Sequence, residues 1–164
     1  HVEDFQLMQL KGFGIEAKKK GIIANASGRV ILYPEKGFKK EKWGYENFVS
    51  LYHSLKIKRV DVHILASLEL EKDVKEALFF EDLTDIKDFF KYGGVFVSND
   101  CGMAHLAGMC GLYTITMFMD FDRETWHPRG EGRWLQLNKD KIDTFLLESI
   151  ILETIELEVK HVTG

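Results

Sequence analysis

The sequence has little of what marks several specialised classes of protein. It contains only two cysteines, Cys101 and Cys110, in 164 residues, which argues against a secreted scaffold held together by disulfides. With two prolines and no serine-rich or repetitive stretch, no internal linker is evident. No apolar run approaches the ~20 residues that a membrane-spanning helix needs, so the sequence predicts no transmembrane segment.

The charge and composition fit an ordinary globular domain. The net charge of −4 lacks the basic excess of a nucleic-acid-binding protein, so we expect no nucleic-acid partner. Hydrophobic residues make up 45% of the chain and charged residues 29%, which is typical of a folded protein rather than a disordered one. A chain of this length can bury one hydrophobic core.

Strand-like and helix-like segments alternate along the chain. Apolar runs predict strands at 30–33, 60–65, 95–97 and 113–118. Helical spacing of apolar residues predicts helices at 5–13, 43–56, 69–80, 83–92, from residue 102, and at 142–159. This alternation favours a mostly parallel sheet with helices on both faces, which is an α/β fold of the Rossmann-like kind.

The most informative stretch is 95–107, which reads VFVSNDCGMAHLA. A strand-like run ends at Asp100, Gly102 turns the chain, and a helix-like segment of small and apolar residues follows. Such a turn directs backbone N–H groups and the positive end of a helix at one place, which favours an anion such as a diphosphate. Taken alone, such a turn is more often structural than functional, because Asp can cap a helix and Gly tolerates unusual dihedral angles.

Residues 99–108, reading NDCGMAHLAG, resemble the D-(T or S)-G-x-x-H-L-A signature of glycosyltransferase family 9, the ADP-heptose:lipopolysaccharide heptosyltransferases. Three further segments resemble the family in the same order along the chain. They are 30–34 with Lys42, Trp43 and Phe48 after it, 111–118, and 126–131 with its W-x-P-x-G pattern.

The resemblance implies one half of a larger enzyme. Members of this family have two Rossmann-like domains that face each other across a cleft, the GT-B arrangement, and the matching motifs belong to the second, nucleotide-sugar-binding half. The chain begins at His1 without an initiator methionine. We therefore expect residues 1–20 to be a lead-in helix from a missing N-terminal domain and residues 21–164 to be the C-terminal donor-binding domain.

The resemblance also implies particular donor contacts. The donor phosphates would be bound by Lys36, Lys40, Lys42, Cys101, Gly102 and His105, and the ribose or sugar by Glu69 and Asp100. Because the family's lysine would fall on Glu41, either Lys40 or Lys42 must fill its role, and Lys40 is favoured. Cys101 replaces the usual Thr or Ser, so a hydroxyl contact is lost while the backbone N–H remains.

Each of these assignments has a plainer alternative. Lysines between a strand and a helix often lie in a surface loop and contact only solvent. Glu69 could merely complement the dipole of the helix whose first turn it would occupy. A lone histidine such as His105 is more often a packing residue than a ligand. A zinc site at Cys101, His105 and Cys110 is not expected, because Cys110 would point to nearly the opposite side of the helix.

The sequence thus predicts the donor-binding domain of an inverting glycosyltransferase. It would transfer heptose or a related sugar from a nucleoside-diphosphate sugar, ADP-heptose by resemblance, to a lipopolysaccharide or another lipid-linked glycan. We expect no metal or other cofactor, a catalytic base in the missing domain, no transfer by the fragment alone, and a cytoplasmic or peripheral inner-membrane location. Alternatives are a nucleotide-sugar epimerase of the same architecture and a degenerate, non-catalytic interaction module.

Overall fold

The structure is a computed structural model of the 164-residue chain. It describes residues 1–18, 21–23, 25, 27–34, 43–66, 77–137 and 141–162, the last six of these without their side chains. In this part of the chain, no helix has the length and apolar character that crossing a membrane requires.

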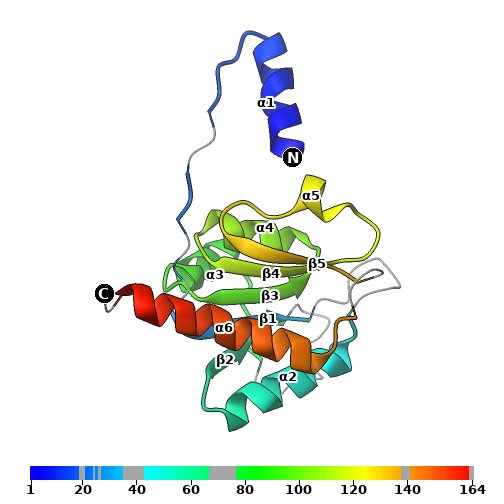
Figure 1. The fold of residues 1–164 in the computed structure, drawn as a ribbon. Helices are drawn as coiled ribbons and strands as arrows, with labels where there is room; N and C mark the ends of the chain where they lie inside the picture. The colour runs from blue at the N-terminus through cyan, green and yellow to red at the C-terminus, as the bar shows by residue number, and fades with distance from the viewer. Residues whose placement is uncertain are drawn as a thin grey trace.

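A five-stranded parallel sheet forms the centre of the domain (Figure 1). The strand order is β2-β1-β3-β4-β5, and every neighbouring pair is parallel. The strands are β1 (Arg29–Tyr33), β2 (Asp61–Ile64), β3 (Val95–Asn99), β4 (Tyr113–Phe118) and β5 (Gly132–Gln136). Parallel strands need a crossover between them, which the helices supply, so the predicted α/β Rossmann-like class is confirmed.

Helices cover both faces of the sheet, as Figure 1 shows. On one face, α2 (Tyr45–Ile57) and α6 (Thr144–Val162) pack against each other and against side chains such as Val95, Val97 and Ile115. On the other face, α3 (Leu83–Phe90) and α4 (Gly102–Met109) cover Ile31 and Phe96. Because both faces are covered, all five residues of β3 are buried and the strand reads as an apolar run rather than an alternating one.

Two elements stand apart from these layers. The helix α1 (Val2–Gly12) projects away from the sheet at the end of an extended segment, and none of its residues is buried (Figure 1). Its first turn meets the chain after α5 (Arg123–Trp126), where Glu3 forms an ion pair with Arg129 at 3.1 Å. The helix was predicted, and its apolar side chains Phe5 and Met8 are more than half exposed. Its origin in a preceding domain stays a prediction.

The helix predicted at 69–80 is wrong over its last four residues, and residues 69–76 lie outside the described residues. Residues 77–80 are not helical, and Leu78 instead forms a parallel bridge with Leu65 directly after β2. The Leu78 N–H donates to the Ile64 carbonyl oxygen, and the Ala66 N–H donates to the Leu78 carbonyl oxygen. A short apolar run can satisfy a sheet edge as well as a helix face, and periodicity alone does not separate the two.

The segment after β4 contains two elements that the sequence did not reveal. The strand β5 reads GRWLQ and is buried only at its last two residues, so it lacks the apolar run that marked the other strands. The one-turn helix α5 is too short to show a helical period. Asp122 caps it by accepting hydrogen bonds from the Thr125 N–H and hydroxyl.

Candidate donor-binding site

The candidate site lies where the strand order changes direction. The chain leaves β1 toward β2 on one side and reaches β3 and β4 on the other, so β1 and β3 are neighbours without being consecutive. At their carboxyl ends, Tyr33 of β1 pairs with Ser98 of β3. Open α/β sheets bind ligands in the crevice outside this switch point, because the two connections run to opposite sides and leave it open.

The turn predicted to bind an anion has the expected geometry. The strand β3 ends at Asn99, Cys101 is the extended N-cap residue with φ −161° and ψ 165°, and α4 begins at Gly102. The Cys101 side chain makes no hydrogen bond to the helix; its thiol lies 3.9 Å from the Ser98 hydroxyl instead. The Cys101 side chain therefore does not cap the first turn of α4, and the start of a helix is a place that favours an anion.

Gly102 faces open space. A Cβ built on it would have no other heavy atom within 4 Å, and its backbone is helical rather than left-handed. The fold therefore does not require glycine here. Close approach of a ligand to the backbone is a separate reason for glycine at such a position, since glycine has no Cβ.

Asp100 and His105 flank this turn on either side. The Asp100 N–H donates to the Met117 carbonyl oxygen at 2.8 Å, which joins the end of β3 to β4 and fixes the direction of the turn. His105 lies on α4, partly exposed, and makes no hydrogen bond or ion pair within the described part of the chain. Its role as a phosphate or sugar ligand stays a prediction.

Asn99 is a positioning residue that the sequence did not single out. Its buried amide accepts a hydrogen bond from the Trp43 N–H at 3.0 Å and donates one to the Trp43 carbonyl oxygen at 3.3 Å. The Trp43 indole donates in turn to the Ile142 carbonyl oxygen at 3.1 Å. These hydrogen bonds link the end of β3 to Trp43, which precedes α2, and link Trp43 to Ile142, which precedes α6, beside the turn. A contact between residues 56 positions apart leaves no local signal in the sequence.

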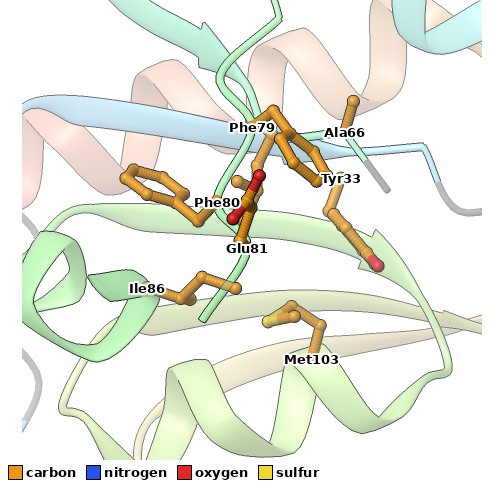
Figure 2. Close-up of a pocket in the computed structure, with 8 residues that line it drawn as sticks. Tyr33, Ala66, Phe79, Phe80, Glu81, Ile86 and Met103 are labelled. Carbon is orange, nitrogen blue, oxygen red and sulfur yellow. The ribbon is translucent and has the colours of Figure 1, made fainter. Parts of the chain in front are cut away.

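A cavity of about 460 Å³ opens beside the same turn (Figure 2). Its wall comes from the carboxyl end of β1, the residues after β2, the segment before α3, and α4. The lining residues are Tyr33, Leu65, Ala66, Phe79, Phe80, Glu81, Ile86 and Met103. Met103 directly follows Gly102, so the cavity and the start of α4 adjoin. A mostly apolar cavity with one carboxylate has the size and lining of a small-molecule site.

The remaining predicted residues have different outcomes. Lys36, Lys40, Lys42 and Glu69 lie outside the described residues. Cys101 and Cys110 occupy opposite ends of α4, as its N-cap and C-cap. Burial raises the pKa of the Cys110 thiol, which keeps it in the protonated form that binds metals poorly. Within the described residues, no group of three or more His, Cys, Asp and Glu side chains could hold a metal ion.

The segment 126–131, which resembles the family's W-x-P-x-G pattern, packs against the back of α4. A Cβ on Gly108 would collide with the Arg129 carbonyl oxygen and would lie 3.2 Å from the Pro128 side chain. The His127 and Trp134 rings stack at 3.7 Å between centroids. The close approach at Gly108 thus packs this segment against the last part of α4.

The fold is a parallel α/β domain of the Rossmann-like class, with a candidate ligand site at its switch point. No family model and no curated protein matches the chain. Among solved structures, the chain is similar to the E. coli heptosyltransferase WaaC with ADP, with a TM-score of 0.69 and 13% sequence identity. The likeness covers 93% of this chain and 56% of that one, so this chain spans little more than half the length of the heptosyltransferase. At such low identity the likeness shows the shared fold.

Proposed function

We propose that the chain is the donor-binding domain of an inverting glycosyltransferase that uses a nucleoside-diphosphate sugar. One observation carries the proposal: the start of α4 and an apolar cavity adjoin at Gly102 and Met103, at the switch point of a parallel sheet. A nucleoside diphosphate has the matching shape, with an anionic group beside a flat, largely apolar base. The similar structure is that of a heptosyltransferase with ADP, which supports adenine as the base.

In this proposal the diphosphate lies at the first turn of α4. The N–H groups at Cys101 and Gly102 would donate to its oxygens, and the helix dipole would favour its charge. His105 lies one turn further along the helix and supplies a side-chain donor to a phosphate or sugar oxygen. Lys36, Lys40 and Lys42 precede Trp43 in the sequence, and Asn99 holds Trp43 next to the turn. Asp100 would contact the sugar or orient the turn that holds the sugar phosphate. Glu69 would bind the ribose hydroxyls, since a carboxylate can accept from two of them at once.

The chemistry of the whole enzyme divides between this chain and another domain. An acceptor hydroxyl would attack the anomeric carbon of the donor, the bond to the diphosphate would break, and the nucleoside diphosphate would leave with inversion. The carboxylate that takes the acceptor proton would lie in the other domain. The residues of this chain would stabilise the charge that develops on the departing diphosphate, which is the electrostatic part of the catalysis.

The resemblance of residues 99–108 to the heptosyltransferase signature supports a more specific donor and acceptor. We propose heptose, carried by ADP, as the donor sugar and lipopolysaccharide or another lipid-linked glycan as the acceptor, met in the cytoplasm or at the inner membrane face. No metal or cofactor is needed for this role. The chain by itself would bind the nucleotide weakly and transfer nothing.

Calorimetric titration with ADP and with UDP tests the proposal. Binding of ADP that is weakened by Asp100→Ala or by Lys40→Ala supports the donor site at this turn, and Glu124→Gln, on the exposed face of α5, is the matched control. Tighter binding of UDP than of ADP would indicate a UDP-linked donor sugar and would still support a glycosyltransferase domain. A folded chain that binds neither nucleotide would contradict the proposal and favour a non-catalytic interaction module, which the loss of the hydroxyl at Cys101 would then explain.

A further inference from the structure

Two aromatic residues beyond the carboxyl end of β4 lie at the surface rather than in the core. Phe121 precedes α5 and Trp126 ends it, and each residue is more than 40% exposed. Their ring centroids lie 5.5 Å apart, at an interplanar angle of 47°. We call Phe121 and Trp126 the aromatic pair. It places two large rings against each other and in contact with solvent, where the packing of the core does not require them.

The loop that carries Phe121 is held by one buried side chain. Gln136, at the end of β5, is 6% exposed. Its NH₂ group is shared among the carbonyl oxygens of Phe118, Met119 and Phe121, at 3.4, 3.0 and 3.3 Å. These hydrogen bonds fix the path of the loop, and the Asp122 cap fixes the start of α5. The aromatic pair is therefore in place before a ligand arrives, which lowers the entropic cost of binding.

The aromatic pair follows the same edge of the sheet as the candidate donor site. In the spatial order of the strands, the cavity opens at the ends of β1 and β2, α4 begins after β3, and the loop 119–122 follows β4. The Asp100 N–H donates to the Met117 carbonyl oxygen at 2.8 Å, so this loop starts close to Asp100. A donor that extends from the cavity across the start of α4 would direct its sugar toward β4, and the acceptor sugar would lie next to it.

The side chains around the aromatic pair suit a neutral sugar. One face of a sugar ring carries C–H groups that pack on an aromatic ring, and the hydroxyl groups at its edge need hydrogen-bond partners. Asp120, Asp122 and Glu124 are exposed, and carboxylates accept hydrogen bonds from hydroxyl groups but repel an anion. Arg123 lies among them in the sequence, and it donates to the Trp134 carbonyl oxygen and pairs with Glu124.

The size of the aromatic pair also fits a sugar better than a protein. A stable protein interface buries about 800 Å² on each partner, far more than two partly exposed rings offer. A single sugar ring, by contrast, covers an area similar to that of one or two aromatic rings. An acidic peptide or an anionic lipid would in addition be repelled by the three carboxylates.

We propose that the aromatic pair binds a neutral sugar ring of the glycan acceptor. The inference rests on the proposed function, because it takes the acceptor from the glycosyl transfer described above. It gives this chain a part in acceptor binding beside its part in donor binding. Contact with one aromatic ring of the pair corresponds to about threefold to tenfold in dissociation constant.

Titration of the isotopically labelled 164-residue chain with two trisaccharides, followed by nuclear magnetic resonance, tests the inference. Mannotriose is the neutral probe and trigalacturonate the acidic one. The variant Phe121→Leu keeps an apolar side chain and removes the ring. Tyr92→Leu is the matched control, because Tyr92 is 73% exposed and precedes β3, at the opposite edge of the sheet. ADP is titrated into each protein separately.

We expect mannotriose to shift the Phe121 amide and the Trp126 indole signals of the wild type. Phe121→Leu should raise the dissociation constant about threefold to tenfold, Tyr92→Leu should leave it unchanged, and trigalacturonate should bind more weakly than mannotriose.

Three results would overturn the inference while ADP binding leaves the donor site intact. They are the absence of shifts at the aromatic pair with millimolar mannotriose, unchanged binding by Phe121→Leu, and binding of trigalacturonate as tight as that of mannotriose. A folded wild type that binds neither ADP nor mannotriose would overturn the proposed function together with this inference.

Discussion

The substitution Gly102→Ala separates the fold of the candidate site from its binding function. A methyl group at this position meets open space, with no other heavy atom within 4 Å, and the backbone is already helical. Alanine is favoured over glycine in helices by up to about 1 kcal/mol in the interior and by less at the first position. The free energy of unfolding should therefore stay the same or rise by about 0.5 kcal/mol.

The same methyl group would stand in front of the N–H groups at the start of α4. If the donor diphosphate lies there, it must retreat and lose at least one hydrogen bond to a charged oxygen, worth about 1.5–3 kcal/mol. The dissociation constant for ADP should rise about tenfold to a hundredfold. Calorimetric titration gives the binding constant, and urea denaturation followed by circular dichroism gives the stability.

Gly108→Ala, further along the same helix, is the matched comparison. There the added Cβ collides with the Arg129 carbonyl oxygen, so the substitution should destabilise the fold by about 1–3 kcal/mol through overpacking. Gly102→Ala should thus weaken ADP binding without lowering the stability of the fold. Gly108→Ala should lower the stability of the fold without weakening ADP binding by the folded protein. ADP binding that is unchanged by Gly102→Ala in a fully stable protein would refute the placement of the diphosphate.

Two further predictions concern the surroundings of the site and the core. Asn99→Ala removes both hydrogen bonds to the Trp43 backbone and should lower the free energy of unfolding by about 1–3 kcal/mol. Urea denaturation measures this, and an unchanged denaturation midpoint would show that these two hydrogen bonds do not stabilise the fold. Burial would raise the pKa of Glu148, but hydrogen bonds from Ser54 and Lys58 and the charge of Lys58 outweigh it, so the pKa is lowered. A folded-state pKa below the unfolded one stabilises the protein above the unfolded pKa of about 4.5 and loses this effect as the pH falls through the folded pKa. The wild type should thus lose more stability than Glu148→Gln between pH 6 and pH 3, about the range where carboxylates titrate, in thermal melts; parallel losses would contradict the assignment.

The sequence predicted the elements whose signal is local. The strand–turn–helix at 95–107 could be recognised because an apolar run, a turn residue and a small-residue helix follow one another directly, and the structure places β3, Cys101 and α4 there. The strand β5 could not, because an edge strand that is half exposed carries no continuous apolar run.

Contacts between distant segments explain the rest of what the sequence missed. The apolar residues at 77–80 fit a helix as well as an edge bridge, and only the presence of Leu65 beside Leu78 decides between the two. The hydrogen bonds between Asn99 and Trp43 join residues 56 positions apart, with α2, β2 and α3 between them, so no spacing in the sequence indicates them.

The central claim is that a nucleoside diphosphate lies across the start of α4 and the cavity beside it. Titrating ADP into the isotopically labelled chain, with the backbone amide signals followed by nuclear magnetic resonance, tests this residue by residue. We predict concentration-dependent shifts at Cys101, Gly102 and Met103 together with shifts at Phe80 and Glu81, while the amides of α1 stay unchanged. Shifts confined to other surfaces, or none at all in a folded protein at millimolar ADP, would contradict the account.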